Sequence, residues 1–361
     1  MNVKPIAFYL PQFHPVRENS EWWGEGFTEW TNVARARPNF DGHYQPHIPK
    51  HLGFYDLRLP EVMQRQTDMA REFGVHGFCF YHYWFSGRRI LELPVNNFLA
   101  SNIDFPFCVC WANENWNRRW DGLDQEILLA QEYSTDNDLR FIHDLLPLLK
   151  DPRYIRVGGK PVLLVYRTGD LPDPKATAEL WRKEAMKAGL PGLHLVSVLS
   201  LWTPLADPKS YGFDALVEFP PHGFGFPVDR RPVRINENSK DHLYYDYNKA
   251  VDTSLRRGVA PFPVYRGVMP SWDNTARKQD NGLTFLNSSP EAYRAWLAQL
   301  VVHTCRHVPE DRRFIFINAW NEWAEGAHLE PDLKHDLAYL KATRQALVDG
   351  QAIASKIEVV A

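Results

Sequence analysis

Two glutamates stand three residues apart near the end of the chain, in NAWNEWAEGAHLEPD, residues 318 to 332. Glu322 and Glu325 follow RRFIFI, an apolar segment typical of a buried strand, so one turn could direct both carboxylates into the same cleft. Such a pair can cleave a glycosidic bond, because one carboxyl protonates the leaving oxygen while the other acts on the opposite side of the sugar ring. Mutual repulsion and the flanking Trp320 and Trp323 would raise the pKa of one member toward that of a general acid.

The same spacing has a simpler structural interpretation. Acidic residues three apart often open a helix, where they complement its dipole. Taken alone, the spacing favours that role. The pair therefore indicates catalysis only if other suitable side chains converge on the same place.

Aromatic and polar side chains do follow most of the apolar runs. The chain contains 13 Trp and 15 Tyr, and many of them cluster with Asn, Glu, His and Arg. This mixture suits a sugar, whose C–H faces stack on aromatic rings and whose hydroxyls need directional partners. The candidate substrate-binding residues are Tyr9, His14, Tyr81, His82, Tyr83, Trp84, Trp111, Asn113, Glu114, Asn115, Trp116, Arg118, Trp272, Asp273, Asn321 and Trp323.

Structural roles compete with ligand contact at each of these positions. A single aromatic residue at a strand end is as often a packing residue as a ligand contact. Glu114 could cap a helix, and Arg118 with Arg119 could clamp a loop carboxylate. His82, inside an apolar strand, is more often a core histidine than a ligand. The convergence of many such residues favours a site.

Eight short apolar runs, each typical of a strand, recur with room for a helix between them. They cover residues 5–10, 77–83, 105–111, 161–166, 193–199, 215–220, 262–268 and 313–320. Helical patterns separate most of them, at residues 60–74, 136–150, 176–189, 291–305 and 336–350. This alternation predicts an α/β fold, a closed (β/α)8 TIM barrel, in one domain over residues 1–361. Because loops after barrel strands carry function, the long excursions 11–59 and 221–260 are expected to wall a cleft at the C-terminal face.

Composition argues against several other classes of partner. The formal net charge of −3 offers no basic field for nucleic acid. The longest apolar runs fall far short of the roughly 20 residues of a membrane helix. No secretory leader is evident, so we expect a soluble cytoplasmic chain, or a periplasmic or secreted one if a leader was trimmed. The four cysteines lack the spacing of a zinc or redox pair, so we expect reduced thiols, no metal and no cofactor. The oligomeric state stays open.

Longer strings carry a resemblance to a known family. They are AFYLPQFHP, EWWGEGFTEWTNV, GHYQPHIP, LGFYDLR, GFCFYHYWFSGRRILE, WANENWNRRWDG, PSWDNTAR and NAWNEWAEGAHLEPD. Together they extend over essentially the whole chain and resemble the WbsX family, found in O-antigen and other polysaccharide gene clusters and labelled there as glycosyltransferases. That family is in turn similar to glycoside hydrolase family 99, endo-acting α-mannan enzymes on a (β/α)8 barrel.

The similarity to family 99 centres on an Asn-Glu-Trp-x-Glu-Gly string, matched here by Asn321, Glu322, Trp323, Glu325 and Gly326. It implies a retaining hydrolase in which Glu322 is a general base on the substrate's own 2-hydroxyl, which attacks the anomeric carbon to form a 1,2-anhydro sugar. Glu325 would protonate the leaving group and then activate water to open the epoxide. The implied route requires no metal, and it needs a 2-hydroxyl trans to the leaving group, as in α-mannosides or α-rhamnosides.

Two other functions stay open, a nucleotide-sugar glycosyltransferase and a carbohydrate-binding barrel without catalysis. A transferase needs a diphosphate site, normally a metal held by Asp-x-Asp or a Gly-rich loop at a helix start. Here the Asp-x-Asp at residues 136 to 138 opens a predicted helix, where capping explains it better. The sequence contains no Gly-rich phosphate loop, so it favours hydrolysis of an oligosaccharide or polysaccharide.

Overall fold

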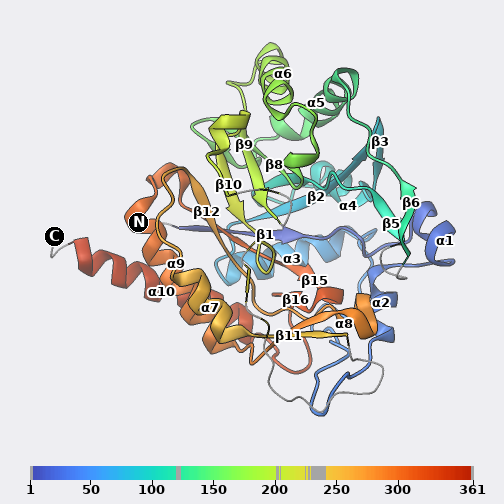
Figure 1. Cartoon of the computed structure of the whole chain (residues 1–361), viewed down its shortest axis with the longest axis vertical. Helices are drawn as coiled ribbons and strands as arrows, with labels where there is room; N and C mark the ends of the chain where they lie inside the picture. Colours follow the sequence, from blue (N-terminus) through green and yellow to red (C-terminus); the bar gives the residue numbers. More distant parts are fainter. Residues whose placement is uncertain are drawn as a thin grey trace.

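The computed structural model describes residues 3–118, 123–200, 203, 205–223, 225, 226, 228 and 241–358. Within them, eight parallel strands lie at the centre of the molecule, and helices surround them (Figure 1). The strands are β1 (Lys4–Tyr9), β2 (Gly77–Phe85), β4 (Phe107–Trp111), β8 (Lys160–Val165), β9 (His194–Leu199), β10 (Ala215–Glu218), β12 (Val264–Val268) and β14 (Phe314–Ile317). Each predicted strand is confirmed, with its ends displaced by a few residues.

The sheet closes on itself through its first strand. Ile6 of β1 lies opposite Gly77 of β2 on one side and Phe316 of β14 on the other, and both pairings are parallel. The remaining neighbours pair in parallel in the order β2, β4, β8, β9, β10, β12, β14. The predicted (β/α)8 barrel is therefore confirmed. All strands end at one rim, where the loops that follow them meet.

The five predicted helices are also present. They are α3 (Pro60–Glu72), α5 (Thr135–Lys150), α6 (Pro174–Lys187), α9 (Pro290–His307) and α10 (Ala338–Glu358). The side chains of Ser134, Asp173 and Ser289 cap the first turns of α5, α6 and α9. The Asp-x-Asp lies in the first turn of α5, which agrees with its predicted helix-opening position. Two more helices, α4 (Leu93–Ala100) and α7 (Tyr247–Leu255), complete this layer.

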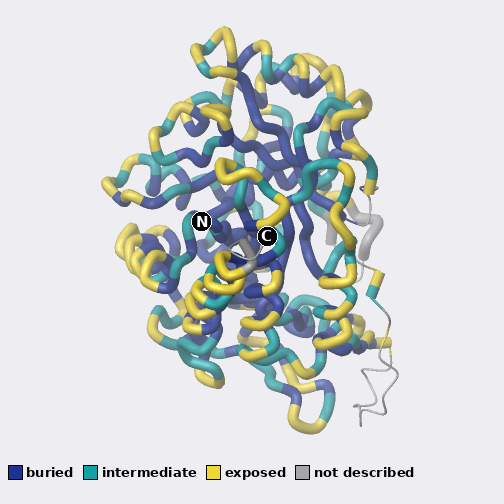
Figure 2. Tube along the Cα trace, turned by 90° about the vertical axis from the view of Figure 1, so that its left-hand side faces the viewer, coloured by how far each residue is buried: buried dark blue, intermediate teal, exposed yellow. Residues whose placement is uncertain are grey.

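The core lies in and around the barrel. Figure 2 shows strand segments as buried and the outward turns of the helices as exposed. Barrel strands are buried on both faces, because side chains fill the interior and helices cover the outside. All four cysteines are free and buried, as expected. No helix in the described ranges is long and apolar enough to cross a membrane.

The long excursions add small elements at the rim. The first carries α1 (Arg17–Trp23) and α2 (Glu29–Arg35). The second is described only in part, and within it β11 (Leu243–Asp246) pairs in parallel with β13 (Leu283–Leu286), which lies further along the chain. Shorter hairpins pair β2 with β3 (Arg88–Ile90), β5 (Trp116–Arg118) with β6 (Leu123–Leu129), β7 (Arg156–Val157) with β8, and β15 (Asn321–Glu322) with β16 (Ala327–His328).

Candidate active site

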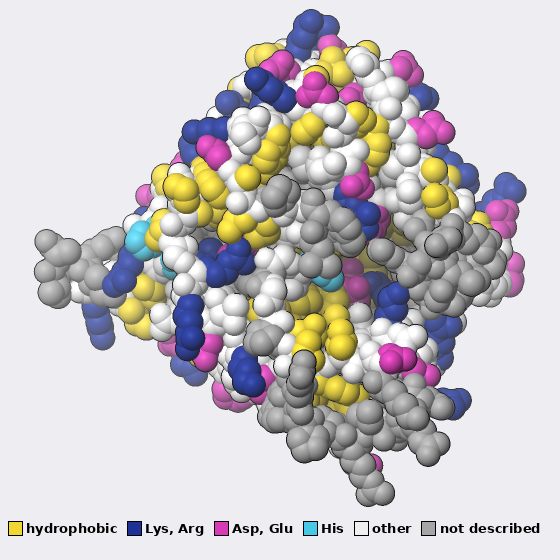
Figure 3. All heavy atoms as spheres, in the orientation of Figure 1, with side chains coloured by type: hydrophobic (Ala, Val, Ile, Leu, Met, Phe, Trp, Pro, Cys, Tyr) yellow, Lys and Arg dark blue, Asp and Glu magenta, His cyan; other side chains and the backbone are white. Residues whose placement is uncertain are grey.

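A cavity of about 320 Å³ opens where the barrel strands end. Its walls come from β2 itself and from the loops after β1, β4, β8, β10, β12 and β14, which are brought together by the closed sheet. Figure 3 shows acidic, basic and histidine side chains beside one another near the middle of this face. The cavity lining thus combines charged side chains with aromatic rings.

Glu322 and Glu325 both line this cavity. Glu322 ends β15, and Glu325 lies in the single 3-10 turn Trp323–Glu325 that leads into β16. Gly326 closes the turn at a φ of 58°, where a Cβ would lie 3.0 Å from backbone atoms of Asp273, so glycine fits this position best. The three-residue spacing thus belongs to a tight hairpin and does not open an α-helix.

One arginine contacts both carboxylates. Arg277 of α8 (Thr275–Lys278) places Nη2 2.8 Å from Oε2 of Glu322 and Nη1 2.6 Å from Oε1 of Glu325. Its Nε lies 2.6 Å from Oε1 of Glu29, the first residue of α2, which is fully buried. Three carboxylates of the described residues therefore contact a single guanidinium. If all three were ionised they would outnumber its charge, which favours retaining a proton.

Burial raises the pKa of both members of the pair. Glu322 reaches a pKa of about 8, because burial outweighs the attraction of Arg277 and Glu325 adds repulsion. Burial also raises the pKa of Glu325, against the opposing effect of Arg277. The pair therefore holds a proton at neutral pH, and Glu322 is the preferred carrier. This proton has to leave Glu322 before that residue can act as the base that the family resemblance implies.

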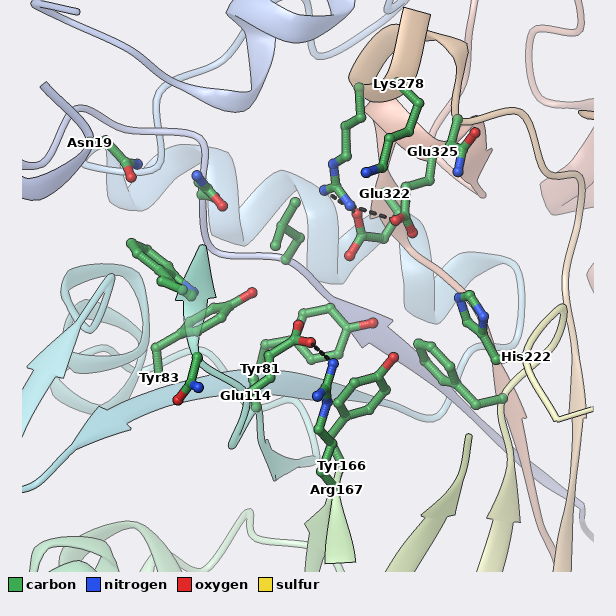
Figure 4. A pocket seen from close by; sticks show the side chains of 18 of the residues that line it. Asn19, Tyr81, Tyr83, Glu114, Tyr166, Arg167, His222, Lys278, Glu322 and Glu325 are labelled. Atoms are coloured by element: carbon green, nitrogen blue, oxygen red, sulfur yellow. Dashed lines mark hydrogen bonds and ion pairs between the residues drawn. The ribbon is translucent and has the colours of Figure 1, made fainter. Parts of the chain in front are cut away.

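A second ion pair faces the glutamates across the cavity (Figure 4). Nη2 of Arg167 lies 2.7 Å from Oε2 of Glu114. The side chain of Asn113 bonds both the backbone N–H and the backbone carbonyl of Arg167, so it holds this wall in place. Tyr81 and Tyr166 point into the space between the two walls.

The tyrosine hydroxyls near the pair are hydrogen-bond donors. Burial, followed by the charges of Glu322 and Glu325, raises the pKa of Tyr81 well above its usual range. Burial has the same effect on Tyr166. Both hydroxyls therefore stay protonated and can donate to sugar oxygens.

Two buried polar groups at the cavity have no hydrogen-bond partner among the described residues. Both amide atoms of Asn19 and the indole Nε1 of Trp272 are in this state, and both residues line the cavity. Leaving a buried polar atom unpaired costs about 1–3 kcal/mol, so these atoms favour a polar ligand or water beside them.

Part of the predicted site is assembled by the fold. The predicted residues that line the cavity are Tyr81, Tyr83, Glu114, Asn115, Trp116, Trp272, Glu322 and Glu325. Tyr83 and Trp116 contact each other with ring centroids 5.4 Å apart, and Trp272 meets the ring of His222 at 5.3 Å. These rings provide flat apolar surfaces between the two charged walls.

The predicted residues on the outer faces of β2 and β4 lie away from the cavity. His82 and Trp84 alternate with the two tyrosines of β2, so their side chains leave the barrel and contact Phe141 of α5. Trp111 stacks on Phe141 at 4.2 Å, and its indole donates to the backbone carbonyl of Trp84. These side chains belong to the layer between strands and helices.

Another group of predicted residues lies behind the hairpin of β15 and β16. Trp323 donates to buried Glu330 at 2.6 Å. Tyr9 donates to Gln66, which donates in turn to the same carboxylate. The side chain of Asn321 bonds both backbone groups of Leu10. These residues support the hairpin from within the fold.

Three predicted residues remain. His14 is buried, and burial lowers its pKa. Asp273 accepts hydrogen bonds from His43 at 2.5 Å and from Thr275, so it ties two loops together. Although burial acts to raise the pKa of Asp273, the contact with His43 holds it well below its usual range. The side chain of Arg118 lies outside the described residues, as does Arg119.

Other cavity residues were not among the predicted binding residues. Arg277, Tyr166 and Arg167 follow barrel strands, and that position places them at the rim from the sequence alone. Asn19, which lines the cavity, and Glu29, which contacts Arg277, lie in the first excursion, where no local pattern marks them.

Sequence comparison identifies relatives over almost the whole chain. The model of the family described as "Glycosyltransferase WbsX" matches residues 5–343. Two proteins named "Uncharacterized protein WxcX", from two strains of Xanthomonas campestris pv. campestris, are 47% identical over 354 residues. The match covers 98% of this chain and 50% of each relative, so the chain spans about half the length of the curated relatives it matches.

Structural comparison identifies glycoside hydrolase barrels. A "Glycoside hydrolase-like protein" aligns with a TM-score of 0.60 at 16% identity, covering 96% of this chain and 94% of that one. A GH99 endo-alpha-mannosidase from Bacteroides thetaiotaomicron aligns with a TM-score of 0.59 at 14% identity, covering 97% and 98%. At these identities the likeness shows a shared fold.

Proposed function

The chain belongs to the WbsX glycosyltransferase family, and from this premise and the geometry of its cavity we propose that it is a retaining glycoside hydrolase. The observation that carries the proposal is the placement of Glu322 and Glu325 on one wall of the cavity, both in contact with Arg277. The barrel shared with an endo-alpha-mannosidase supports it as a fold-level analogy.

The first step starts from the form in which the shared proton has moved from Glu322, its preferred carrier, to Glu325. Ionised Glu322 removes the proton of the 2-hydroxyl, whose oxygen attacks the anomeric carbon as the glycosidic bond breaks. Protonated Glu325 gives its proton to the leaving oxygen. The products are a free alcohol and a 1,2-anhydro sugar, and the proton of the pair now resides on Glu322.

In the second step water opens the epoxide. Glu325 takes a proton from water while the oxygen of that water attacks the anomeric carbon, and Glu322 returns its proton to the 2-oxygen. One water molecule is consumed, and the pair recovers its starting protonation. Arg277 touches both carboxylates, so its charge stabilises whichever member is ionised.

The proposed substrate is an oligosaccharide or polysaccharide with α-manno or α-rhamno linkages. Its hydroxyls would pair with Tyr81, Tyr166 and the unpartnered amide of Asn19. Its C–H faces would stack on Tyr83 and Trp116. The Glu114 and Arg167 ion pair supplies both an acceptor and donors on the opposite wall.

A glycosyltransferase is the second candidate, because the family's own description names that activity. A glycosyltransferase would take its sugar from a nucleotide sugar, whereas a hydrolase uses water to cleave a glycosidic bond. Binding of a free nucleotide therefore distinguishes the two activities.

The test measures release of reducing sugar from a panel of bacterial polysaccharides and 4-nitrophenyl α-mannosides and α-rhamnosides. Glu322→Gln and Glu325→Gln should each lower kcat by about 10²–10⁴-fold, the usual contribution of a general acid or base. The melting temperature should change little, and exposed Glu61→Gln should retain full activity.

Two outcomes would contradict the proposal. Undiminished cleavage by both Gln variants would remove the pair from catalysis, and unfolding of both would assign it a structural role. GDP, UDP and dTDP should give no thermal shift. A shift together with consumption of the matching nucleotide sugar would establish the transferase.

A further inference from the structure

A second cavity, of about 530 Å³, shares Trp272 with the candidate active site. His47, His328 and Asp332 lie together in its wall, and their exposed fractions are 8%, 4% and 2%. One ligand atom of each residue lies within 4.8 Å of the others. We propose that these three side chains bind a divalent cation of the zinc type.

The distances among the three groups suit a cation after a small adjustment. Nδ1 of His47 lies 2.8 Å from Nε2 of His328, and that Nε2 lies 3.9 Å from Oδ2 of Asp332. With Zn–N bonds of about 2.0–2.1 Å, two nitrogens on a tetrahedral zinc lie about 3.3 Å apart. Opening the histidine pair by roughly half an ångström therefore makes room for the ion. The cavity beside it offers space for water at the remaining coordination position.

His328 has the tautomer that a metal ligand requires. Its Nδ1 lies 2.8 Å from the backbone carbonyl of Glu330, which can only accept, so Nδ1 carries the proton. Nε2 therefore presents its lone pair to His47 and Asp332. A histidine that binds a metal usually donates its other ring N–H in this way.

The chemistry of the donors fits the same cation. Two imidazoles and one carboxylate are a common ligand set for zinc. Without a cation, Nδ1 of His47 donates to Nε2 of His328. Metal titration distinguishes this hydrogen-bonded pair from the cation-bound cluster.

Backbone pairing holds the ligands at the right places. The N–H of Leu333 donates to the carbonyl of Ile48 at 2.9 Å, and the N–H of Lys50 donates to that of Pro331 at 2.8 Å. These bonds fix the segment of His47 beside that of Asp332. The sites of the ligands are therefore formed by the fold itself.

His328 connects the cluster to the hairpin of β15 and β16. His328 lies in β16 opposite Asn321 of β15, and its ring stacks on Trp323 at 3.8 Å. A cation at this cluster would join the first long excursion to the hairpin that carries Glu322 and Glu325. Its role would be to stabilise that hairpin, outside the candidate active site.

The experiment uses the whole chain, stripped with EDTA, dialysed and titrated with Zn²⁺ by calorimetry. We expect one equivalent to bind with a submicromolar Kd, and His47→Ala to weaken binding by about 100-fold or more, since even lost outer contacts cost 10–100-fold. Asp332→Asn, which keeps an oxygen for the N–H of His335, should weaken binding too. Co²⁺ in place of Zn²⁺ should give the visible absorption of a four- or five-coordinate site, and His47→Ala should lose it.

The matched control is His303→Ala. His303 and His307 lie one turn apart on α9 with ring centroids 4.9 Å apart, so they could bind zinc adventitiously at the surface. This variant should bind like the wild type. Loss of binding in it, or unchanged binding by His47→Ala, would overturn the proposal.

Thermal unfolding gives a second readout. Zn²⁺ at about 100 µM should raise the Tm of the wild type and of His303→Ala by mass action, and should leave that of Asp332→Asn almost unchanged. If His47→Ala fails to fold, Asp332→Asn decides the question. A wild-type Tm that does not respond to zinc would show that no such site exists.

Discussion

At the scale of single residues, Arg277 governs the electrostatics of the candidate site. It contacts Glu29, Glu322 and Glu325, and it lowers the pKa of both cavity glutamates against the effect of burial. The balance leaves a proton in the pair at neutral pH. Because the two carboxyls interact, their titration belongs to the pair as a unit.

The pair should give a bell-shaped pH profile of kcat/KM. Activity should fall above about pH 8, where the last proton leaves and no general acid remains. It should also fall at low pH, where both carboxyls are protonated and no base remains. The measurement is the initial rate on the cleaved glycan from about pH 4 to about pH 10. Constant activity through the alkaline range would contradict the shared-proton mechanism.

Arg277→Met should move the alkaline limb to higher pH. Removing the cation removes the attraction that favours the ionised carboxylates, so the proton is held more tightly. The value of kcat/KM should fall by about 10²-fold, as for loss of other preorganised electrostatic groups. Arg167→Met is the matched control, because Arg167 contacts Glu114 on the opposite wall. The alkaline limb of Arg167→Met should stay at about pH 8. Equal shifts in both variants would refute the role of Arg277 in setting this limb.

At the scale of elements, the hairpin of β15 and β16 is supported from behind by Glu330. This carboxylate accepts from Trp320 and Gln66 on one oxygen and from Trp323 and Tyr55 on the other. Four donors from three segments of the chain thus meet on one buried group, next to the pair of catalytic candidates. Burial raises the pKa of Glu330 to about 7, against these hydrogen bonds.

Glu330→Gln should change how stability depends on pH. The folded wild type keeps the Glu330 proton up to about pH 7, whereas the unfolded chain loses it near pH 4.5. Wild-type stability should therefore fall across this window relative to the variant, by roughly 1–3 kcal/mol. Urea unfolding at about pH 5 and about pH 7.5 measures the difference. The exposed control Glu61→Gln should show the same pH dependence of the free energy of unfolding as the wild type. The same dependence in Glu330→Gln would show that burial does not hold the Glu330 proton.

At the scale of the whole molecule, closure joins the start of the chain to its end. β1 lies between β2 and β14, so the barrel needs residues from both ends of the sequence. We propose that residues 1–361 form a single domain. The cavity is built only when the barrel is closed, since its walls come from β2 and from the loops after six other strands.

Unfolding of the 361-residue chain should therefore be one cooperative transition. Far-UV circular dichroism and tryptophan fluorescence should give coincident denaturation curves. Ile6→Ala, in the fully buried middle of β1, should shift both curves together by about 2–5 kcal/mol. If only one of the two signals shifted, the chain would contain two independent units.

Much of the fold could be predicted because its signals are local. The parallel strands are buried on both faces and so appear as continuous apolar runs, and the helices between them show their own period. Burial on both faces also hides which side chains enter the barrel. On β2 the predicted set included both Tyr81, which lines the cavity, and His82, which lies outside the barrel against α5. The composition of the strand does not separate them, whereas the register of the closed sheet does.

The sequence by itself determined the barrel class, the order of its strands along the chain and the neighbouring pair Glu322 and Glu325, because these follow from periodicity and short spacing. Only the tertiary structure decided which charges surround that pair. Arg277 lies 45 residues from Glu322 and 248 residues from Glu29, and its contacts exist only after the sheet closes. A local pattern carries no information about such contacts, since the fold alone sets the distance between residues that are remote in the chain.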